Sequence, residues 1–429
     1  HTPIGWLMGR SASPDGLALL PGDIESGVAC AVCHRMVDPA PDNNALPDEA
    51  WDRDVIIRQA LTTTLPATQS GSAMLVVDPE DHRRGPFSLG QEFAYHLPSS
   101  TYQTNFHGKE QTDYATRSRL CGSCHNVNNP LLSWDELKQE YVLNEMDQPA
   151  DSFENGQLFP IETTYDEWLN SQYAASGVYA PQFAGELPTG VVGACQDCHM
   201  VRSIGLAAEQ GEFRDCQTNG CLPIHGFVGA NTWTPQILQD NRWRLNAATD
   251  SAHLAETLKA SEEMLRKAAT LSVELKASET GSIAAVKVTN ESGHKLPTGY
   301  AEGRRMWINL SAYDDQGHLV YESGNYNLTS GVLADNAKIY EIKQGITPDL
   351  AKVLDLPDGE SFHFVLNNTV VKDNRIPPRG FSEDALNNKI LQPVGAVYQP
   401  GQYWDETKFQ VPQGTKIVKA TLYYQTASK

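Results

Sequence analysis

The sequence lacks long apolar runs, an excess of positive charge and low-complexity tracts. No apolar stretch reaches the roughly 18 residues that a membrane-spanning helix needs, so we expect no integral membrane segment. Lysine and arginine number 33 against 53 aspartates and glutamates, which gives a formal net charge of −20. Binding to a phosphate backbone relies on clustered cations, so this balance argues against a nucleic-acid partner. The acidity favours solubility and is also suited to attracting a positively charged partner.

Cysteine is absent after Cys221, and the eight cysteines up to that position follow a strict pattern. Six of them form three C-x-x-C-H motifs, "CAVCH" at 30–34, "CGSCH" at 121–125 and "CQDCH" at 195–199. Chance would place roughly 0.004 such motifs in a chain of this composition, and the motif is the attachment signature of c-type haem. The predicted thioether-forming cysteines are Cys30, Cys33, Cys121, Cys124, Cys195 and Cys198, and the predicted iron ligands are His34, His125 and His199.

Other interpretations of these cysteine pairs fit less well. A zinc ribbon has two pairs separated by about 15–20 residues, and these three pairs lie much further apart. A thioredoxin-like pair would occur once, in a βαβ context. Covalent haem attachment takes place outside the cytoplasm, so we expect a periplasmic, extracellular or cell-surface protein. In that oxidising environment the two remaining cysteines, Cys216 and Cys221, are predicted to form a small disulfide loop.

The pattern of apolar residues changes along the chain and predicts an α+β protein. Residues 1–235 hold every cysteine and form a predicted triple-haem domain, mostly helical or irregular, with helices at 48–63 and 163–176. Residues 236–277 are predicted as a helical connector, whose clearest helix covers 250–275 and is capped by Asp250 or Ser251.

The last part of the chain, 278–429, is predicted as an antiparallel β-sandwich. Its apolar residues alternate with a period of two, and "DDQG" at 314–317 is a good hairpin turn. The predicted strands are 282–290, 304–313, 318–323, 361–368 and 415–426.

The second axial ligand of each iron decides what the haems can do. A second histidine makes the iron six-coordinate and suited to electron transfer, whereas an open position can bind a small molecule. His294 is a candidate second ligand because it lies between two predicted strands, in "GHKLPTG", where glycine and proline restrict the loop. The alternative is a surface histidine in a tight turn.

The sequence resembles a family of extracytoplasmic multihaem c-type cytochromes with a C-terminal β-sandwich. The resemblance extends over nearly the whole chain. It rests on the segments "GVACAVCHR" (27–35), "SRLCGSCHNVNNPLL" (118–132), "TTYDEWLNSQYA" (163–174), "GACQDCHM" (193–200), "HGFVGAN" (225–231), "GHKLPTGYAEGRRMW" (293–307), "DNRIPPRGF" (373–381), "GQYWDETKF" (401–409) and "ATLYYQT" (420–426).

The resemblance implies that His294 and His225 are second axial ligands. A third iron needs another partner, and the family tends to carry ligands shortly before the second motif. His96 and His107 both lie there and remain equal candidates, with His82 behind them.

The predicted function is electron transfer through three covalently bound haems, with bis-histidine ligation, between redox partner proteins. Self-association into a complex or filament is a further expectation, since some multihaem cytochromes polymerise. The alternative is a haem enzyme acting on small nitrogen or sulfur species, which would need one open axial site flanked by acid–base residues. A purely structural or adhesive protein fits three covalent cofactors least well. The same motifs serve carriers and enzymes, so the motifs alone do not decide between them.

Overall fold

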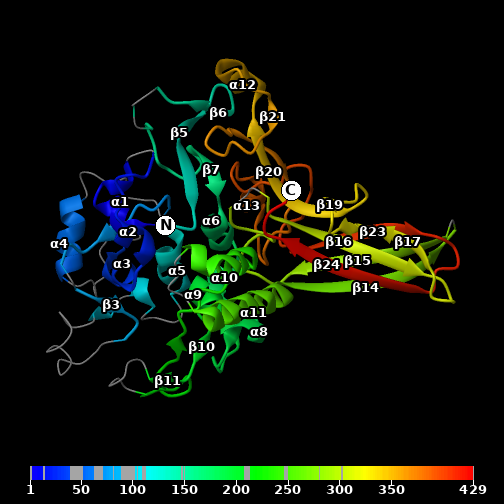
Figure 1. Ribbon diagram of the computed structural model, residues 1–429, viewed down its shortest axis with the longest axis horizontal. Coiled ribbons are helices and arrows are strands. Elements are labelled where there is room, and N and C mark those ends of the chain that lie inside the picture. Colours follow the sequence, from blue (N-terminus) through cyan, green and yellow to red (C-terminus); the bar gives the residue numbers. More distant parts are fainter. Residues whose placement is uncertain are drawn as a thin grey trace. The chain divides into compact units, whose positions relative to one another are not determined.

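The protein combines short helices with antiparallel sheets, which confirms the α+β class (Figure 1). The computed structural model describes residues 2–12, 15–38, 52–61, 71–80, 82–87, 102–103, 105–108, 113–145, 148, 150–206, 213–245, 250–279, 281–300 and 303–428. It divides into two compact units, His1–Cys124 and His125–Lys429. This division falls within the second C-x-x-C-H motif, and the predicted domain boundaries near 235 and 277 stay a prediction.

The described part of the first unit consists of short elements. Its strands pair as β1 (Met36–Val37) with β2 (Val76–Val77), antiparallel, and β3 (Arg84–Gly85) with β4 (Tyr102–Gln103), parallel. The helix predicted at 48–63 corresponds to α4, whose described bounds are narrower. The helical elements are α1 (Pro3–Leu7), η1 (Arg10–Ala12), α2 (Pro21–Ser26), α3 (Cys30–Arg35), α4 (Asp52–Leu61), η4 (Asn105–His107) and α5 (Tyr114–Gly122).

The second unit begins with a three-stranded antiparallel sheet, β5 (Val127–Asp135) between β6 (Glu140–Leu143) and β7 (Leu158–Glu162). Two short helices follow, α6 (Thr164–Leu169) and α7 (Gln172–Ser176).

The prediction of one helix over 163–176 is therefore wrong. The helical hydrogen-bond ladder stops at Ser171, whose hydroxyl donates to the Trp168 carbonyl at 2.6 Å. The next amide, that of Gln172, donates outside the helix to the Arg379 carbonyl at 2.8 Å.

Small elements then surround the third motif, which forms α9 (Cys195–His199). The other elements of this segment are β8 (Val178–Tyr179), α8 (Pro181–Ala184), β9 (Val191–Val192), β10 (Arg202–Ser203), β11 (Gly205–Leu206), β12 (Phe213–Arg214) and β13 (Leu222–Pro223).

Two longer helices follow, α10 (Trp233–Leu245) and α11 (Ser251–Ala268). Asp250 caps α11 by accepting from the amides of Ala252 and His253. The predicted extension of this helix to residue 275 is wrong, because β14 (Ala269–Ser278) starts at once. Its alternating side chains let it pair with β15 (Gly281–Asn290) along its whole length. None of the helices in the described residues combines the length and apolar character required to span a bilayer.

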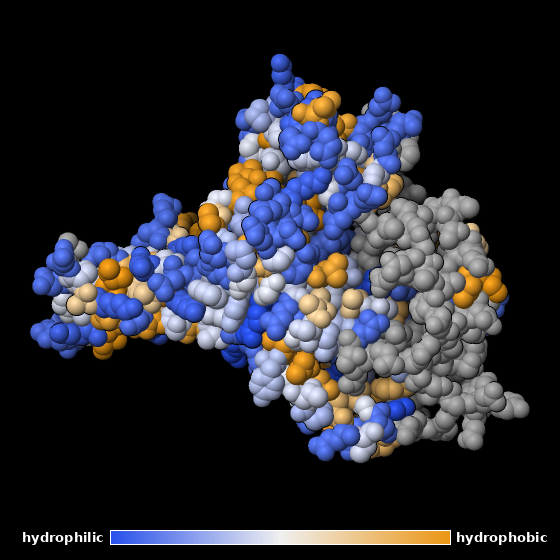
Figure 2. Space-filling view, turned by 180° about the vertical axis from the view of Figure 1, so that it is seen from behind, coloured by the Kyte–Doolittle hydropathy of each residue, from blue (hydrophilic) through white to orange (hydrophobic). Residues whose placement is uncertain are grey.

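Two antiparallel sheets share the main hydrophobic core. The first has the order β14-β15-β23, in which β23 is Trp404–Val411. The second is built around β16 (Arg305–Tyr313), which pairs with β17 (Leu319–Ser323), β20 (Lys338–Ile346) and β24 (Ile417–Gln425). In Figure 1 these strands run side by side away from α10 and α11, and Figure 2 shows their visible face as mostly hydrophilic with scattered apolar side chains. Residues of β15, β16, β20 and β23 meet inside, among them Val286, Ile308 and Tyr340.

The strand predictions are confirmed at 282–290, 304–313, 318–323 and 415–426, with small shifts at the ends. The predicted strand at 361–368 is wrong, because the amides of Leu366 and Asn367 both turn back to the His363 carbonyl. The remaining elements are β17 (Leu319–Ser323), β18 (Tyr326–Asn327), β19 (Val332–Leu333), β20 (Lys338–Ile346), α12 (Pro348–Leu354), β21 (Gly359–Glu360), β22 (Thr369–Asp373), α13 (Glu383–Asn387), β23 (Trp404–Val411) and β24 (Ile417–Gln425).

Candidate haem-ligand histidines

In the first unit, the histidine of the first motif faces His107. The ring centroids of His34 and His107 lie 6.2 Å apart, with an angle of 25° between the ring planes. His34 follows Cys30 and Cys33 on α3, and its Nδ1 donates to the Arg84 carbonyl at 2.7 Å. A hydrogen bond from Nδ1 to a carbonyl fixes the ring and leaves Nε2 to bind a metal, as is usual for metal-ligating histidines.

Arg84, which supplies that carbonyl, is itself held in place. Its guanidinium is fully buried and pairs with the carboxylates of Asp54 and Asp78. The segment that orients His34 is therefore anchored by a buried ionic group, which joins α4 to the chain before β3.

His107 is 8% exposed and belongs to η4. Burial lowers its pKa to about 3, so the ring is neutral at pH 7, and the neutral imidazole is the form that binds iron. Its Nε2 contacts the Cys33 carbonyl at 2.8 Å, and ligation through Nε2 would replace this hydrogen bond.

In the second unit, the histidine of the third motif faces His294. The ring centroids of His199 and His294 lie 6.4 Å apart, and their planes differ by 17°. Both rings use Nδ1 for a backbone carbonyl, His199 with Val228 at 2.5 Å and His294 with Lys295 at 3.0 Å. Nε2 is therefore the nitrogen that each ring would use to bind a metal.

These separations fit two imidazoles on opposite sides of one iron. Two metal–nitrogen bonds of about 2.0 Å, plus ~1.1 Å from each nitrogen to its ring centroid, give a separation of about 6.2 Å. The observed 6.2 and 6.4 Å lie close to this value, and they also lie within the range of about 4.5–7 Å for direct ring pairs. The residues present therefore fit a porphyrin iron, which takes two axial ligands from the protein.

Burial also keeps the second pair of rings neutral. It lowers the pKa of His199 to about 4, and the His294 and His125 rings lower it further. Burial likewise lowers the pKa of His294, against smaller effects that raise it, from the Lys295 carbonyl and the Glu167 carboxylate. The influence of His125 on His199 also shows that the second and third motif histidines lie close enough to interact.

The helix α9 is fixed at both ends by Asp197. One carboxylate oxygen of Asp197 accepts from the amides of Gly193 and Ala194 at 3.1 Å, and the other pairs with Arg202 at 2.7 Å. The Trp168 indole of α6 donates to the Gly193 carbonyl at 2.8 Å. The start of the third motif is therefore tied to α6.

The loop that carries His294 connects β15 to β16. Asn290 closes its base, because its amide donates to the carbonyls of His294 and Ile376 at 2.8 and 2.9 Å. Gly293 lies close to α6 and α7, since an added Cβ would lie 3.0 Å from Cδ1 of Trp168 and 3.2 Å from Cγ of Tyr173, and one of these rings would have to move by a few tenths of an ångström.

His125 has different surroundings from the other two motif histidines. Its side chain is 67% exposed, and its Nδ1 lies 3.4 Å from the Glu162 carboxylate instead of a carbonyl. This hydrogen bond raises the pKa of His125 above its ordinary value, although burial acts against it. The backbone at His125 is joined to α6, because its carbonyl accepts from the Tyr165 amide at 3.0 Å.

The other predicted ligands are placed less clearly. His225 is exposed and its ring contacts that of Phe227, with centroids 5.8 Å apart. The ring that faces His199 is that of His294, and the segment around His225 supports His199 through Val228. His82 lies 3.6 Å from both Asp78 and Glu80, and His96 lies outside the described residues. The second ligands of the three irons therefore stay predictions.

All eight cysteines lie in the described part of the chain. Cys216 and Cys221 form the predicted disulfide, with an S–S distance of 2.09 Å. The six motif cysteines are not joined in disulfides.

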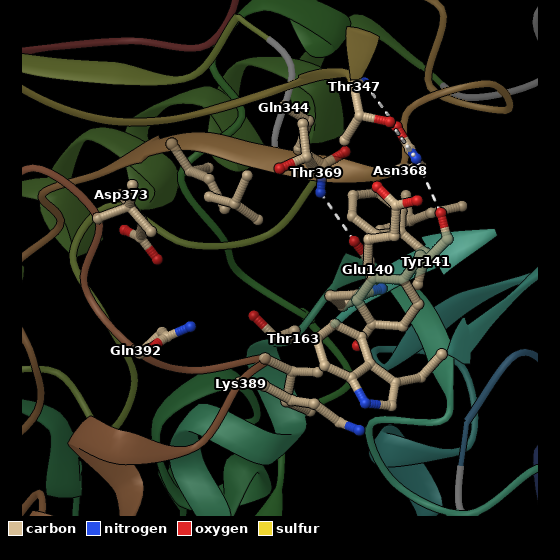
Figure 3. A pocket seen from close by; sticks show the side chains of 18 of the residues that line it. Glu140, Tyr141, Thr163, Gln344, Thr347, Asn368, Thr369, Asp373, Lys389 and Gln392 are labelled. Carbon is tan, nitrogen blue, oxygen red and sulfur yellow. Dashed lines mark hydrogen bonds between the residues drawn. The ribbon is translucent and has the colours of Figure 1, made fainter. Parts of the chain in front are cut away.

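A cavity of about 360 Å³ lies elsewhere in the second unit. Figure 3 shows Glu140 and Tyr141 of β6 on one side and Asp373 of β22 on the other. Its lining contains neither cysteine nor histidine, so these residues supply no iron ligand or thioether bond.

Three contacts of the site were not predicted from the sequence. They are the carbonyls of Arg84 and Val228, which orient two motif histidines, and the carboxylate of Glu162 beside the third. Backbone carbonyls have no sequence signature. Glu162 directly precedes "TTYDEWL", and no motif marks a single carboxylate as the partner of a histidine 37 residues away.

Comparison with known proteins adds little to these observations. No family model matches the chain, and no curated protein matches it. A solved structure, a penta-heme cytochrome c552 from Thermochromatium tepidum, is similar over 100% of this chain and 75% of its own, with 15% identity and a TM-score of 0.47. The functional argument therefore rests on the residues of this chain.

Proposed function

We propose that the protein is an extracytoplasmic multihaem c-type cytochrome that carries three covalent haems and transfers electrons. The observation that carries this proposal is the placing of a second imidazole opposite two of the three motif histidines. When bound, each haem iron supplies one-electron redox chemistry at its site.

The chain's own residues bind, orient and protect these groups. Cys30, Cys33, Cys121, Cys124, Cys195 and Cys198 form the thioether bonds, and His34, His125 and His199 are the motif ligands. His107 is the second ligand opposite His34, and His294 is the second ligand opposite His199. Because burial keeps His107, His199 and His294 neutral, no proton has to leave the rings before they bind iron.

The second ligand for His125 is proposed to be His225. Two observations support it: Val228, three residues further on, holds His199, and His199 interacts electrostatically with His125. His96 is the alternative for this position. With either ligand, all three irons are six-coordinate, the state that favours electron transfer over catalysis.

The proposed domain organisation follows from these roles. Residues 1–235 hold the three attachment motifs, 236–277 connect, and 278–429 deliver His294 from the loop between two strands. The protein functions in the periplasm or at the cell surface, with redox proteins as partners. Self-association remains part of the proposal, and the net charge of −20 suits the chain to docking on a partner with a positively charged surface.

A haem enzyme is the second candidate, and the exposure of His125 favours it at the second haem alone. A small nitrogen or sulfur species would then bind to an open axial position. Such an enzyme would need acid–base residues at that position, and Glu162 is the acidic side chain that contacts His125.

The test is a pyridine haemochrome assay for the number of haems, followed by EPR of the oxidised protein and carbon monoxide addition to the reduced protein. Three haems with low-spin signals and no carbon monoxide shift support the electron carrier. A high-spin haem that binds carbon monoxide favours the haem enzyme over the electron carrier. A count of fewer than three haems overturns the cofactor assignment.

A further inference from the structure

Three segments of the sequence lie outside the C-x-x-C-H motifs, yet they meet in one place. They are "TTYDEWL" in α6, "GHKLPTG" in the His294 loop and "DNRIPPR" after β22. Each contributes a buried charged residue, and Glu167, Lys295, Asp373 and Arg375 are all at most 3% exposed. Charges are rarely buried without partners, so their contacts indicate what this arrangement holds together.

Glu167 is bonded directly to the loop that carries His294. One carboxylate oxygen accepts from the Lys295 amide at 3.1 Å and from the Thr298 hydroxyl at 2.5 Å. The other oxygen accepts from the Thr163 hydroxyl at 2.8 Å and pairs with Arg375 at 2.8 Å. Residues on both sides of the Leu296–Pro297 pair are therefore fixed by a single carboxylate.

Asp373 completes the charge balance. It pairs with Lys295 at 2.7 Å and with Arg375 at 2.8 Å, so two carboxylates face two cations. Lys295 also donates to the Leu391 carbonyl at 2.7 Å. Burial alone would raise the pKa of Glu167, but Arg375 and Lys295 lower it below its ordinary value, so the carboxylate is ionised at neutral pH.

The helix α6, which contains Glu167, also contacts the segment that carries His199, the proposed ligand opposite His294. Trp168, the residue after Glu167, donates to Gly193 at the start of the third motif, and its ring lies against Gly293. Thr164 at the start of α6 accepts from the Gly299 amide at 3.1 Å, at the end of the loop. One short helix therefore contacts both the segment of His199 and the loop of His294.

We propose that Glu167 is a positioning residue for the third haem, which holds the loop so that His294 lies at ligand distance from an iron bound to His199. This inference rests on the proposed function, because it requires haem at the third motif. Lys295, Asp373 and Arg375 assist by compensating the buried charge. Glu167 itself touches neither the haem iron nor the imidazole nitrogen that binds it.

The test compares two variants of the holoprotein, Glu167→Gln and His294→Ala. His294→Ala defines the spectrum of the chain without its second ligand at the third haem, with one high-spin, carbon monoxide-binding haem per chain. In Glu167→Gln, a fraction of the molecules should have this high-spin, carbon monoxide-binding haem, because the glutamine amide cannot accept all four hydrogen bonds or balance the charge of Arg375. Added imidazole should return both variants to the low-spin state.

Glu341→Gln is the matched control. Glu341 is buried and pairs with Lys372 at 2.8 Å, within the sheet that contains β20 and β22, so this variant removes a buried charge from elsewhere. It should stay fully low-spin. If Glu167→Gln does not accumulate, Thr298→Val replaces it, because it removes one hydrogen bond to Glu167 and should lower the temperature at which the third haem becomes high-spin.

The outcomes separate the two proposals. A folded Glu167→Gln protein with wild-type spectra, or a Thr298→Val protein with the wild-type transition, overturns the role of Glu167 while the haem ligands stand. A His294→Ala protein that remains low-spin and inert to carbon monoxide shows instead that His294 is not the ligand, and it overturns both. High-spin signals in Glu341→Gln would show a general loss of stability and also overturn the specific role.

Discussion

The indole nitrogen of Trp168 donates to the Gly193 carbonyl at 2.8 Å, so a residue of α6 holds the backbone two residues before Cys195. Trp168→Phe keeps most of the buried ring and removes this hydrogen bond. Leaving a buried carbonyl without its partner costs about 1–3 kcal/mol, so we expect the free energy of unfolding to fall by that amount. Guanidinium unfolding of the holoprotein, followed by far-UV circular dichroism, measures this loss. An unchanged midpoint would show that the carbonyl finds another donor.

His107→Ala should remove the second axial ligand of the first haem and leave the ligands of the other two haems in place. The reduced variant is expected to bind one carbon monoxide per chain, and the oxidised variant should gain a high-spin EPR signal. His253→Ala is the control, since His253 is an exposed residue on α11 that pairs with Asp250. If His107→Ala behaves like His253→Ala, the second ligand of the first haem is another residue, and His96 becomes the next to test.

Glu162→Gln should raise the reduction potential of the second haem. A carboxylate on Nδ1 increases the basicity of a ligand histidine and stabilises the ferric iron, whereas a neutral amide does so less. His34 and His199 donate to backbone carbonyls, so the effect should be confined to one of three redox steps. A spectroelectrochemical titration measures it, with the exposed Glu136→Gln as a control for loss of charge. A shift of all three steps, or of none, would contradict the assignment.

The stability of the protein should contain a pH-dependent part from Asp166. Burial raises the pKa of this carboxyl to about 6, the Asn126 amide opposes the rise, and the Glu167 charge adds to it. Because the folded pKa lies above the unfolded value of about 3.9, this contribution is present below pH 4 and is lost as the pH rises through 6.

The Asp166→Asn variant isolates that contribution. It should gain stability relative to the wild type between pH 4 and 7, by on the order of 1–3 kcal/mol. Unfolding midpoints of both proteins across that range measure the difference. A difference that does not change with pH would show that Asp166 is ionised throughout.

The sequence allowed local features to be predicted better than distant ones. The period-two pattern of 282–290 matches β15 because alternate residues such as Val286 and Val288 are buried between two sheets. The start of α11 was predictable because Asp250 is a good cap, but its end was not. Residues from Ala269 onward become a strand only because β15 is available to pair with them.

The candidate site divides in the same way. The three motifs are local patterns and identify six cysteines and three histidines directly. That His294 faces His199 depends on contacts made by Asn290 at the end of β15 and by Glu167 and Trp168 of α6, which are two separate segments. The sequence likewise showed no preference between His96 and His107. In the structure His107 is buried and contacts the Cys33 carbonyl, which places its ring beside the first motif.

The position of His294 between β15 and β16 has a consequence for the maturation of the protein. The third motif is synthesised before the strands on either side of its proposed second ligand. If His294 is that ligand, haem can be attached at Cys195 and Cys198 while His199 is the single protein ligand of the iron. His294 can bind only after the C-terminal sheets have folded. The change of spin state at this haem would then be a built-in optical reporter of the last folding step.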